Sequence, residues 1–393
     1  MIGQDKKILL IMGGYGVGGV AEQFIETMLN QYSSDNIYRF SIVDISASSL
    51  NLDVHGYSAT VQKVPVYSLP ILSSLSYWWF KQKYLASSID QIKELVEKHE
   101  IQLIWIILNT PQIVQIGSEL RNKVTIPFVT QIWDTPEYLS QTYFLDMLTR
   151  KHFLTSFDNT LKTAKRGIAI SDSMNSIYSK RYGLFFRTMV FCAPKGSGVL
   201  PFRKKPLGKK INIIFAGSMY APQTWNAFLD AVEERNNLIN DPQIVVHCIG
   251  NASMWAKKRK WVKYEPLKPI SEAIKVINEA DIAYLPYWMS ARKSYAAKTA
   301  FPSKLSLYVT AGTPIFYHGP KDSTPVEFMN RYRVGKCCHS TNSHTILDTI
   351  DSMLDIDFVA QYDKSRETAY QEVFHPDNCN EIFRESIEIS LMS

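Results

Sequence analysis

Short apolar runs that alternate with helical patterns constrain the fold of this chain more than any other feature. The first run, residues 8–12, follows two lysines and is unbroken, which is typical of a parallel strand buried on both faces. It leads into a glycine-rich turn at 13–19. Further strands are expected at 38–45, 103–108, 126–129 and 167–170, and helices at 21–29 and 87–99. This alternation predicts a doubly wound α/β domain over residues 1–195.

The second half of the chain repeats the pattern of the first. Residues 196–210 are rich in Gly, Pro and Lys without a periodic apolar face, which indicates a linker. Strands are then expected at 211–215, 244–249, 282–285 and 313–317, and helices at 223–234, 271–279, 304–311, 344–354 and 378–391. We therefore expect an α/β protein of two Rossmann-like (βαβ) domains facing a central cleft. The second domain would span 211–376, and a C-terminal helix at 377–393 would cross back to the first domain.

The composition suits two folded domains. Of 393 residues, 46% are hydrophobic and 20% are charged, which argues against a disordered or fibrous chain. The five cysteines form no CxxC motif and no Cys/His cluster, so we expect a reducing compartment, no metal and no cofactor. No apolar run is long enough for a signal-peptide core or a membrane span. We expect a cytoplasmic protein, associated at most with the inner face of a membrane.

The net charge of +6 is unevenly spread along the chain. Residues 195–268 contain thirteen Lys or Arg against five Asp or Glu, whereas residues 341–393 contain three against eleven. The basic stretch could meet an anionic membrane or nucleic acid, or form an ordinary solvated surface. Because no RRM, KH or helix-turn-helix signature accompanies it, nucleic acid is not an expected partner.

The glycine turn contains Gly14-x-Gly16-x-x-Gly19, with Asp44 at the end of the next strand. Glycines let backbone N–H groups approach a phosphate at a helix N-terminus. The motif fits phosphate or acceptor binding in a sugar transferase, a nicotinamide or flavin nucleotide, or a tight turn without a ligand.

A second informative module begins at Phe301-Pro302-Ser303-Lys304-Leu305 and ends at Gly312-Thr313-Pro314. We expect Pro302 to break the preceding loop and the Ser303 side chain to cap the helix by accepting an N–H bond. A lysine in the first turn opposes the helix dipole, which suggests that an external anion lies beside Lys304. A capped helix without a ligand would explain the same residues.

Several of these motifs together resemble family 4 glycosyltransferases of the GT-B fold. The resemblance is carried by Gly18-Gly19-Val20-Ala21-Glu22, Ala216-Gly217-Ser218, Ala280-Asp281-Ile282-Ala283 and the module from Pro302 to Pro314. It implies a hexosyltransferase that moves a sugar from a nucleotide-diphosphate donor to a glycan or lipid-linked acceptor, in polysaccharide or glycoconjugate biosynthesis. The implied reaction is retaining and metal-independent, with the donor on the C-terminal domain and the acceptor on the N-terminal domain.

The resemblance also implies donor-binding residues. They are Gly18 and Gly19 near the diphosphate, Gly217 and Ser218 from the other domain, Tyr264, Glu265 and Leu267 along the nucleobase, and Pro302, Ser303 and Lys304 at the ribose and phosphates. The chain departs from the family at Leu307, where a ribose-binding Glu is usual, and at 219–226, which lack the usual Arg and Lys.

Cations in a nearby loop could replace the missing basic residues. Arg292, Lys293 and Lys298 lie between Tyr287 and Pro302 and could neutralise the leaving diphosphate together with Lys304. A solvated loop would explain them equally. Arg292 and Lys304 are the strongest candidates for a catalytic role.

Candidate acceptor residues end two strands of the first domain. Trp133 and Asp134 follow the run at 126–129, and the Asp134 carboxylate could act as a base or stabilise a cationic transition state. Ser171 and Asp172 match the family at the next strand end. Helix capping is the competing role for Asp134 and for the Ser171 segment.

Residues 69–84 concentrate aromatic side chains, including Tyr77, Trp78, Trp79 and Phe80, beside two lysines. This mixture suits a membrane interface, and packing of a helix on its own domain would explain it as well.

Two further hypotheses concern function. Leu307 is compatible with a catalytically silent relative that binds a partner subunit, and the glycine turn with Asp44 is compatible with an NAD-binding oxidoreductase.

Overall fold

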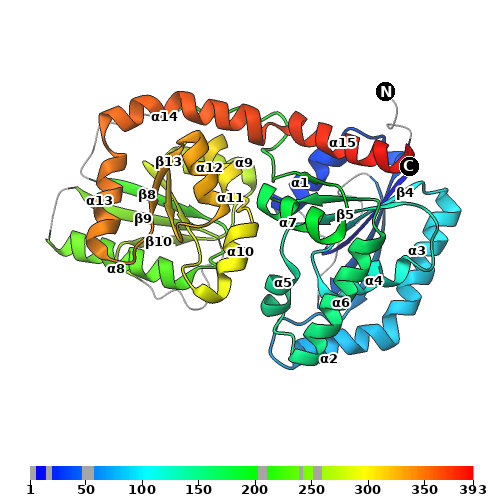
Figure 1. The fold of residues 1–393 in the computed structure, drawn as a ribbon. Coiled ribbons are helices and arrows are strands. Elements are labelled where there is room, and N and C mark those ends of the chain that lie inside the picture. Colours follow the sequence, from blue (N-terminus) through cyan, green and yellow to red (C-terminus); the bar gives the residue numbers. More distant parts are fainter. Residues whose placement is uncertain are drawn as a thin grey trace. The chain divides into compact units, whose positions relative to one another are not determined.

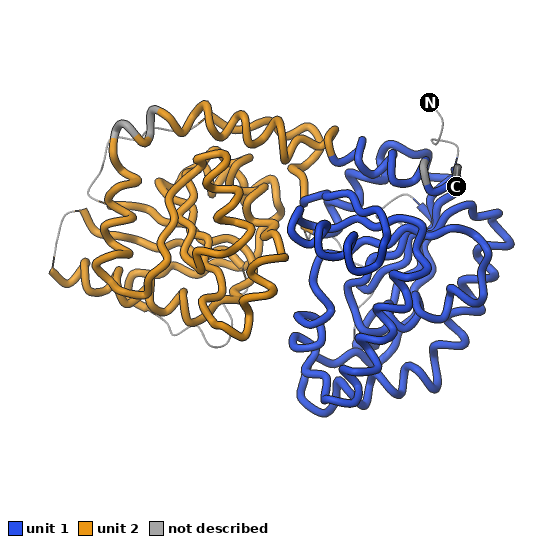
Figure 2. Tube along the Cα trace, viewed as in Figure 1, with its two compact units in different colours: residues 1–17, 21–190, 379–393 blue, residues 18–20, 191–378 orange. Residues whose placement is uncertain are grey.

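The computed structural model describes residues 6–14, 20–46, 57–201, 210–238, 242–250 and 259–392. Gly18, Gly19 and the basic clusters at 203–205 and 257–258 lie outside the described residues. The chain divides into two compact units (Figure 2), residues 1–17, 21–190 and 379–393 forming unit 1 and residues 18–20 and 191–378 forming unit 2. The domain bounds expected from the sequence stay a prediction.

Unit 1 is built on a parallel seven-stranded sheet of order β3-β2-β1-β4-β5-β6-β7 (Figure 1). Its strands are β1 (Ile8–Gly13), β2 (Ile37–Asp44), β3 (Ser58–Val64), β4 (Leu103–Ile107), β5 (Phe128–Ile132), β6 (Arg166–Ala169) and β7 (Phe186–Thr188). Its helices are α1 (Val20–Leu29), η1 (Ser34–Asn36), α2 (Leu72–Trp79), η2 (Phe80–Tyr84), α3 (Leu85–His99), α4 (Pro111–Leu120), α5 (Pro136–Thr142), α6 (Met147–Thr163) and α7 (Asp172–Tyr182). The expected doubly wound arrangement is confirmed.

Unit 2 repeats the arrangement with a parallel six-stranded sheet of order β10-β9-β8-β11-β12-β13. Its strands are β8 (Lys210–Ala216), β9 (Gln243–Ile249), β10 (Val262–Glu265), β11 (Ile282–Pro286), β12 (Ile315–His318) and β13 (Gly335–Cys338). Its helices are α8 (Pro222–Leu238), α9 (Ile270–Asn278), η3 (Ala291–Lys293), α10 (Ser294–Thr299), α11 (Lys304–Thr310), α12 (Thr324–Tyr332), α13 (Ser343–Met353), α14 (Ile356–Ala369) and η4 (Tyr370–Phe374). In its core the rings of Phe228 and Tyr284 stack at 4.0 Å.

The last helix, α15 (Pro376–Met392), packs on unit 1 from Cys379 onward. The Phe383 ring lies 4.4 Å from that of Trp105 and 6.1 Å from that of Tyr32, measured between centroids. The Gln31 side chain also donates a hydrogen bond to the Asn380 carbonyl, at 3.4 Å. These contacts bury one face of the helix against the sheet of unit 1.

Some strands lie where the apolar pattern does not predict them. The strand expected at 126–129 is β5, Phe128–Ile132, and it contains two buried polar residues. One of them, Gln131, accepts a hydrogen bond from Trp105 Nε1 at 3.0 Å, which a pattern of apolar residues cannot reveal. The strand expected at 313–317 is β12, Ile315–His318. The edge strands β3, β7, β10 and β13 are short or partly polar and were not expected.

In both sheets the strand order reverses at the first strand, because β1 lies between β2 and β4 in unit 1 and β8 lies between β9 and β11 in unit 2. Ligands of doubly wound proteins bind beyond the carboxyl ends of the strands at such a position. The fold therefore directs attention to Gly13 and Gly14 after β1 and to Gly217 and Ser218 after β8.

Candidate functional site

Two glycines lie together at the carboxyl edge of the sheet in unit 2. The Gly217 N–H donates to the Ile249 carbonyl at 2.8 Å, and the Gly250 N–H donates to the Glu265 carbonyl at 3.0 Å. Gly217 and Gly250 have φ values of +101° and +134°, a region that favours glycine. A Cβ on Gly250 would lie 2.4 Å from the Gly217 carbonyl oxygen. The backbone beyond β8 and that beyond β9 can approach this closely because Gly250 has no side chain.

The Lys304 side chain lies against this edge. Lys304 begins α11 and is only 7% exposed, and its Nζ donates to the Ser218 carbonyl at 3.1 Å. Nζ is also 4.4 Å from the Tyr220 ring centroid and 5.3 Å from that of Phe215, distances at which aromatic faces attract a cation. A Cβ on Gly217 would lie 3.2 Å from Lys304 Cε. Three residues expected in the donor site thus lie together.

No described carboxylate balances the charge of Lys304. Within the part of the chain that the structure describes, no carboxylate lies within ion-pair distance of its amine. Burial lowers the pKa of Lys304 from 10.5 to about 7, because the charged form loses its hydration. Ser218 and the backbone of Gly217 remain accessible to solvent. A buried amine without a counterion, beside an accessible edge, suits an external anion.

The loop cations differ from Lys304. Arg292 lies on η3 and is exposed, and Lys293 is half-buried beside it. Lys298 lies on α10, is exposed and forms an ion pair with Asp322. An exposed cation keeps its hydration, and the Lys298 amine already has a carboxylate partner in Asp322. Their proposed contact with a diphosphate stays a prediction.

Glu265 ends β10 beside two lysines and a histidine. Its carboxylate lies 2.5 Å from Lys263 Nζ, 3.1 Å from Lys268 Nζ and 3.2 Å from His247 Nε2. Hydrogen bonds from Lys263 and Lys268 lower the pKa of Glu265 to about 2. Tyr264 is half-buried and Leu267 is exposed. This strand end presents a fixed carboxylate, although the nucleobase contact inferred for it remains untested.

The expected cap on α11 is wrong. Ser303 stands at the N-cap position, but its side chain accepts no N–H of the helix. Its φ and ψ of −57° and −22° are helical, whereas a capping side chain needs an extended backbone to reach back to the helix. Its carbonyl accepts the Ser306 hydroxyl at 2.9 Å instead. Pro302 is half-buried beside it, and Leu307 one turn later is buried.

In unit 1, a buried arginine holds the start of the glycine turn. Arg39 on β2 has no exposed surface, and Glu22 on α1 binds it through both carboxylate oxygens at 2.8 Å. Arg39 Nη2 also donates to the Gly14 carbonyl at 2.9 Å. Arg39 Nε donates to Ser41 at 2.8 Å, and Nη1 reaches Tyr57 at 3.3 Å. All five N–H groups of the guanidinium are used, so Arg39 serves the fold.

Arg39 is not among the residues predicted from the sequence. In the sequence it is a charged residue within a mostly apolar strand, and Glu22 is an acid that closely follows the glycine turn. Asn109 completes the clamp, since its amide accepts from the Gly13 N–H and donates to the Gly13 carbonyl, both at 2.8 Å.

Asp44, the residue on which the oxidoreductase hypothesis rests, is engaged locally. Its Oδ1 accepts from the Ser46 N–H at 2.8 Å, and its Oδ2 accepts from the Val66 N–H at 2.7 Å. A ribose-binding carboxylate needs its oxygens for sugar hydroxyls. This geometry weighs against a dinucleotide at β2.

The structure decides which residues cap the helices near the acceptor candidates. Thr135, not Asp134, caps α5, since its hydroxyl accepts from the Tyr138 N–H at 3.3 Å. Asp134 is half-buried instead. Burial of Tyr138 and Tyr143, together with the negative charge of Asp134, raises the pKa of both tyrosines to about 12. Trp133 packs edge to face on Phe24 at 6.4 Å. Asp134 therefore has no capping role.

Ser171 and Asp172 lie at the next strand end. The Ser171 hydroxyl is buried and caps α7 by accepting from the Met174 N–H at 3.1 Å. Asp172 follows in the first turn and is exposed. The capping role left open for this segment is present at Ser171, and acceptor binding stays a prediction for both residues.

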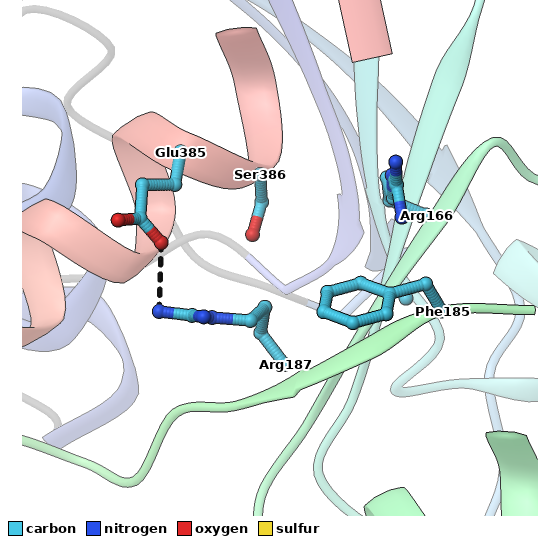
Figure 3. Close-up of a pocket in the computed structure, with 6 residues that line it drawn as sticks. Arg166, Phe185, Arg187, Glu385 and Ser386 are labelled. Atoms are coloured by element: carbon cyan, nitrogen blue, oxygen red, sulfur yellow. Dashed lines mark ion pairs between the residues drawn. The ribbon is translucent and has the colours of Figure 1, made fainter. Parts of the chain in front are cut away.

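Figure 3 shows a cavity of about 60 Å³ in unit 1 beside α15. Arg187 Nη2 lies 2.7 Å from Glu385 Oε2, and the Arg166 guanidinium lies 4.9 Å from the Phe185 ring centroid. Sites for small molecules usually span about 300–1,000 Å³. This cavity is too small for a sugar nucleotide and marks where α15 meets the sheet edge.

The described residues contain no group of three or more His, Cys, Asp or Glu side chains that could hold a metal ion. None of their helices is both long and apolar enough to span a bilayer.

No protein-family model and no curated protein matches the sequence. The structure, by contrast, is similar to solved glycosyltransferase structures over nearly its whole length. Sucrose-phosphate synthase from Thermosynechococcus elongatus has a TM-score of 0.70 and 11% identity, over 99% of this chain and 100% of that one. WaaG, described as a glycosyltransferase involved in lipopolysaccharide biosynthesis, has a TM-score of 0.58 and 12% identity, over 97% and 99%.

A third structure, described as trehalose-6-phosphate from E. coli bound with UDP-2-fluoro glucose, has a TM-score of 0.60 and 12% identity, over 98% of this chain and 99% of that one. At such identities the likeness establishes the fold. The chain has the two-domain α/β architecture of GT-B proteins, as expected from its sequence.

Proposed function

We propose that this protein is a glycosyltransferase of the family 4 type, which moves a sugar from a nucleotide-diphosphate donor to an acceptor. The observation that carries the proposal is Lys304, a buried amine without a carboxylate partner among the described residues, beside the glycine edge of β8 and β9. The GT-B fold supports it, because one structure of similar fold is described as bound with UDP-2-fluoro glucose.

The proposed chemistry uses the charge of this amine. Transfer breaks the bond between the anomeric carbon of the sugar and the β-phosphate oxygen, which leaves with an additional negative charge. A cation held in place stabilises that charge without reorganising in the reaction. In our proposal Lys304 Nζ and the backbone at Gly217 hold the diphosphate, so no metal ion is needed. The reaction would retain the anomeric configuration of the sugar.

Unit 1 would supply the acceptor side. Asp134 is half-buried two residues beyond the end of β5, and Thr135 is the N-cap of α5. We propose that the Asp134 carboxylate takes part in the reaction, because ligands of doubly wound proteins bind beyond the carboxyl ends of the strands. We propose a glycan or lipid-linked acceptor, since WaaG is described as acting in lipopolysaccharide biosynthesis. A lipid-linked acceptor would require the enzyme to work at a membrane surface.

A catalytically silent binding subunit is the second candidate. A buried Leu307 replaces the family's ribose-binding Glu, and the cation on Arg292 is exposed on a short helix. If these departures abolish donor binding, the fold would serve only to bind a partner.

Ligand-dependent thermal unfolding separates the candidates. The protein is heated with UDP-, GDP- and dTDP-sugars and with NAD and NADP in separate samples. A ligand at 100 times its Kd stabilises the folded state by about 2.7 kcal/mol. We expect a rise in Tm with at least one sugar nucleotide and none with NAD or NADP. No rise with any sugar nucleotide contradicts the transferase and supports the silent subunit, whereas a rise with NAD or NADP alone supports an oxidoreductase.

A further inference from the structure

Most of the exposed large apolar side chains of the described residues gather in two segments of unit 1. Nine of fourteen lie within residues 67–79 and 144–148, which we call the apolar surface. Met147 and Ile71 are 81% and 75% exposed, and Leu148 and Leu75 are mainly exposed as well. Contiguous exposed apolar patches are uncommon on proteins that have no partner or membrane to contact.

Hydrogen bonds join the two segments into one surface. The Asp146 N–H donates to Ser74 Oγ at 3.0 Å, and Trp78 Nε1 donates to Thr149 Oγ1 at 2.9 Å. These bonds connect α2 to the start of α6, at the end of unit 1 where both are labelled in Figure 1. The exposed residues of both segments therefore belong to the same part of the unit.

The polarity of α2 is reversed relative to a normal surface helix. Its serines and Tyr77 are buried, whereas Leu72, Leu75 and Trp79 form an exposed stripe. The Ser73 hydroxyl is hydrogen-bonded to the Leu69 carbonyl at 2.8 Å, and Ser76 donates to the Pro65 carbonyl. A helix in water normally buries its apolar face. Here the polar groups are satisfied inside, and the leucines face outward.

Backbone strain accompanies two of the exposed apolar residues. Ile71 has a φ of +67° and Phe144 a φ of +49°, in the left-handed region. The Phe144 conformation ends α5, since the Leu145 N–H donates to the Ser140 carbonyl at 3.0 Å and the Phe144 N–H to the Gln141 carbonyl at 3.1 Å. Ile71 stands at the N-cap position of α2. Both turns thus present an apolar side chain to solvent.

Cations without a carboxylate partner lie next to the apolar surface. Among the residues that the structure describes, Lys81 and Lys83 on η2 and Arg150 and Lys151 on α6 form no ion pair, and the Lys81 amine is hydrogen-bonded to His152 Nε2 at 2.7 Å. Lys83 Nζ is 5.7 Å from the Trp79 ring centroid. Residues 67–84 contain no acid at all, and 144–151 contain only Asp146. That carboxylate already accepts the Leu148 and Thr149 N–H groups, both at 2.9 Å.

We infer that the apolar surface docks on an anionic lipid bilayer. Leu72, Leu75, Trp79 and Met147 would enter the interfacial region, and the four cations would contact lipid phosphates. A second copy of the chain fits less well, because it would bring the same cations together. The inference does not depend on the transfer reaction, and its test uses no donor or acceptor.

Vesicle flotation tests the docking directly. The full chain is mixed with vesicles of phosphatidylcholine and phosphatidylglycerol in equal amounts, or of phosphatidylcholine alone. We expect flotation with the anionic vesicles that weakens with salt, and about a fivefold loss of affinity for each lysine removed, in Lys83→Gln and Lys151→Gln. Leu75→Ser with Met147→Ser should abolish flotation. The matched controls Leu238→Ser and Lys98→Gln, exposed residues elsewhere, should bind like wild type.

Failure to float with anionic vesicles would overturn the inference. Equal flotation of the surface variants and their controls would overturn it too, as would a dimer that dissociates on Leu75→Ser without any vesicle binding. All substituted side chains are exposed, so folding is checked by an unchanged Tm.

A fluorescent label locates the contact. The five native cysteines are buried or half-buried, so Leu75→Cys adds an accessible thiol for an environment-sensitive fluorophore. Its emission should shift to the blue on anionic vesicles, whereas the same label at Leu238→Cys should not respond. A response at Leu238→Cys equal to that at Leu75→Cys would contradict docking through this surface.

Discussion

Two buried cations, each hydrogen-bonded to a carbonyl just beyond a central strand, have opposite surroundings. Arg39 in unit 1 is fully buried, pairs with Glu22 through two hydrogen bonds and uses every N–H group on its neighbours. Lys304 in unit 2 is almost as buried, but it meets one carbonyl and two aromatic rings. No carboxylate of the described residues pairs with it.

The difference separates a structural cation from one for which we propose a function. Burying a charge is unfavourable unless a partner compensates it. For Arg39 the Glu22 carboxylate is the compensating partner. Arg39 also donates a hydrogen bond to the Gly14 carbonyl at the start of the glycine turn. For Lys304 the missing compensation would come from an external anion. Substitutions at the two positions should therefore affect different properties.

Replacing Arg39 should have the largest effect, and on stability. Arg39→Met leaves the Glu22 carboxylate buried without its cation, which should lower the free energy of unfolding by about 3–5 kcal/mol. Urea unfolding of the two proteins measures the difference. Adding Glu22→Gln to Arg39→Met should recover part of the loss, because no buried charge remains. If Arg39→Met lowers the free energy of unfolding by less than the loss of an exposed ion pair, about 0.2–1 kcal/mol, the structural role of Arg39 is contradicted.

Replacing Lys304 should affect ligand binding and turnover but not stability. Lys304→Met should weaken nucleoside diphosphate binding, spare the nucleoside and reduce kcat by about 10²–10³-fold. Its unfolding free energy should be unchanged or higher, since the uncompensated amine is gone. Isothermal titration and steady-state kinetics provide both readouts. Lys275→Met, which removes an exposed cation on α9 of the same unit, is the matched control. Equal diphosphate affinity of Lys304→Met and wild type would refute the role.

Asp134 tests whether unit 1 contributes a reacting group besides its structural clamp. Asp134→Asn keeps the size of the side chain and removes the charge, so turnover should fall about a hundredfold while donor affinity stays the same. Asp90→Asn, which changes an exposed acid on α3 of the same unit, should leave both unchanged. An unaltered kcat in Asp134→Asn would exclude the carboxylate from the reaction.

The exposed ion pair of Arg187 and Glu385 should contribute far less to the free energy of unfolding than the buried pair of Arg39 and Glu22. Both side chains are about two-fifths exposed. Arg187→Met should therefore lower the free energy of unfolding by only about 0.2–1 kcal/mol, and the difference should shrink with added salt. A loss as large as that of Arg39→Met would mean that burial does not distinguish the two pairs.

The sequence predicts the architecture well because the central strands are buried on both faces. Unbroken apolar runs such as 8–12 and 103–108 therefore identify β1 and β4, and the module at 302–304 leads to Lys304. The pairing of Glu22 with Arg39 and the lack of a pair at Lys304 depend on contacts distant along the chain, so no local pattern contains them. Ser303 shows a similar limit, since its residue type suits a cap and its backbone does not.

The residues at 69–84 show why one pattern can support two interpretations. Tyr77 and Phe80 are buried, as packing on the domain requires, while Leu75 and Trp79 on the same helical stretch are exposed. Packing on the domain describes the buried face of this segment, and the membrane interface stays a proposal for the exposed face. Composition alone cannot assign residues to a face when serines, not leucines, point inward.

Proton uptake on nucleotide binding tests the central claim about Lys304 most directly. With its pKa at about 7, the amine is largely neutral about one pH unit above that value, and a bound diphosphate should raise the pKa and protonate it. Titration calorimetry of a nucleoside diphosphate in two buffers of different ionisation enthalpy should show uptake approaching one proton, absent in Lys304→Met. Affinity should fall as the pH rises further. Binding without proton uptake by the wild type would contradict the account.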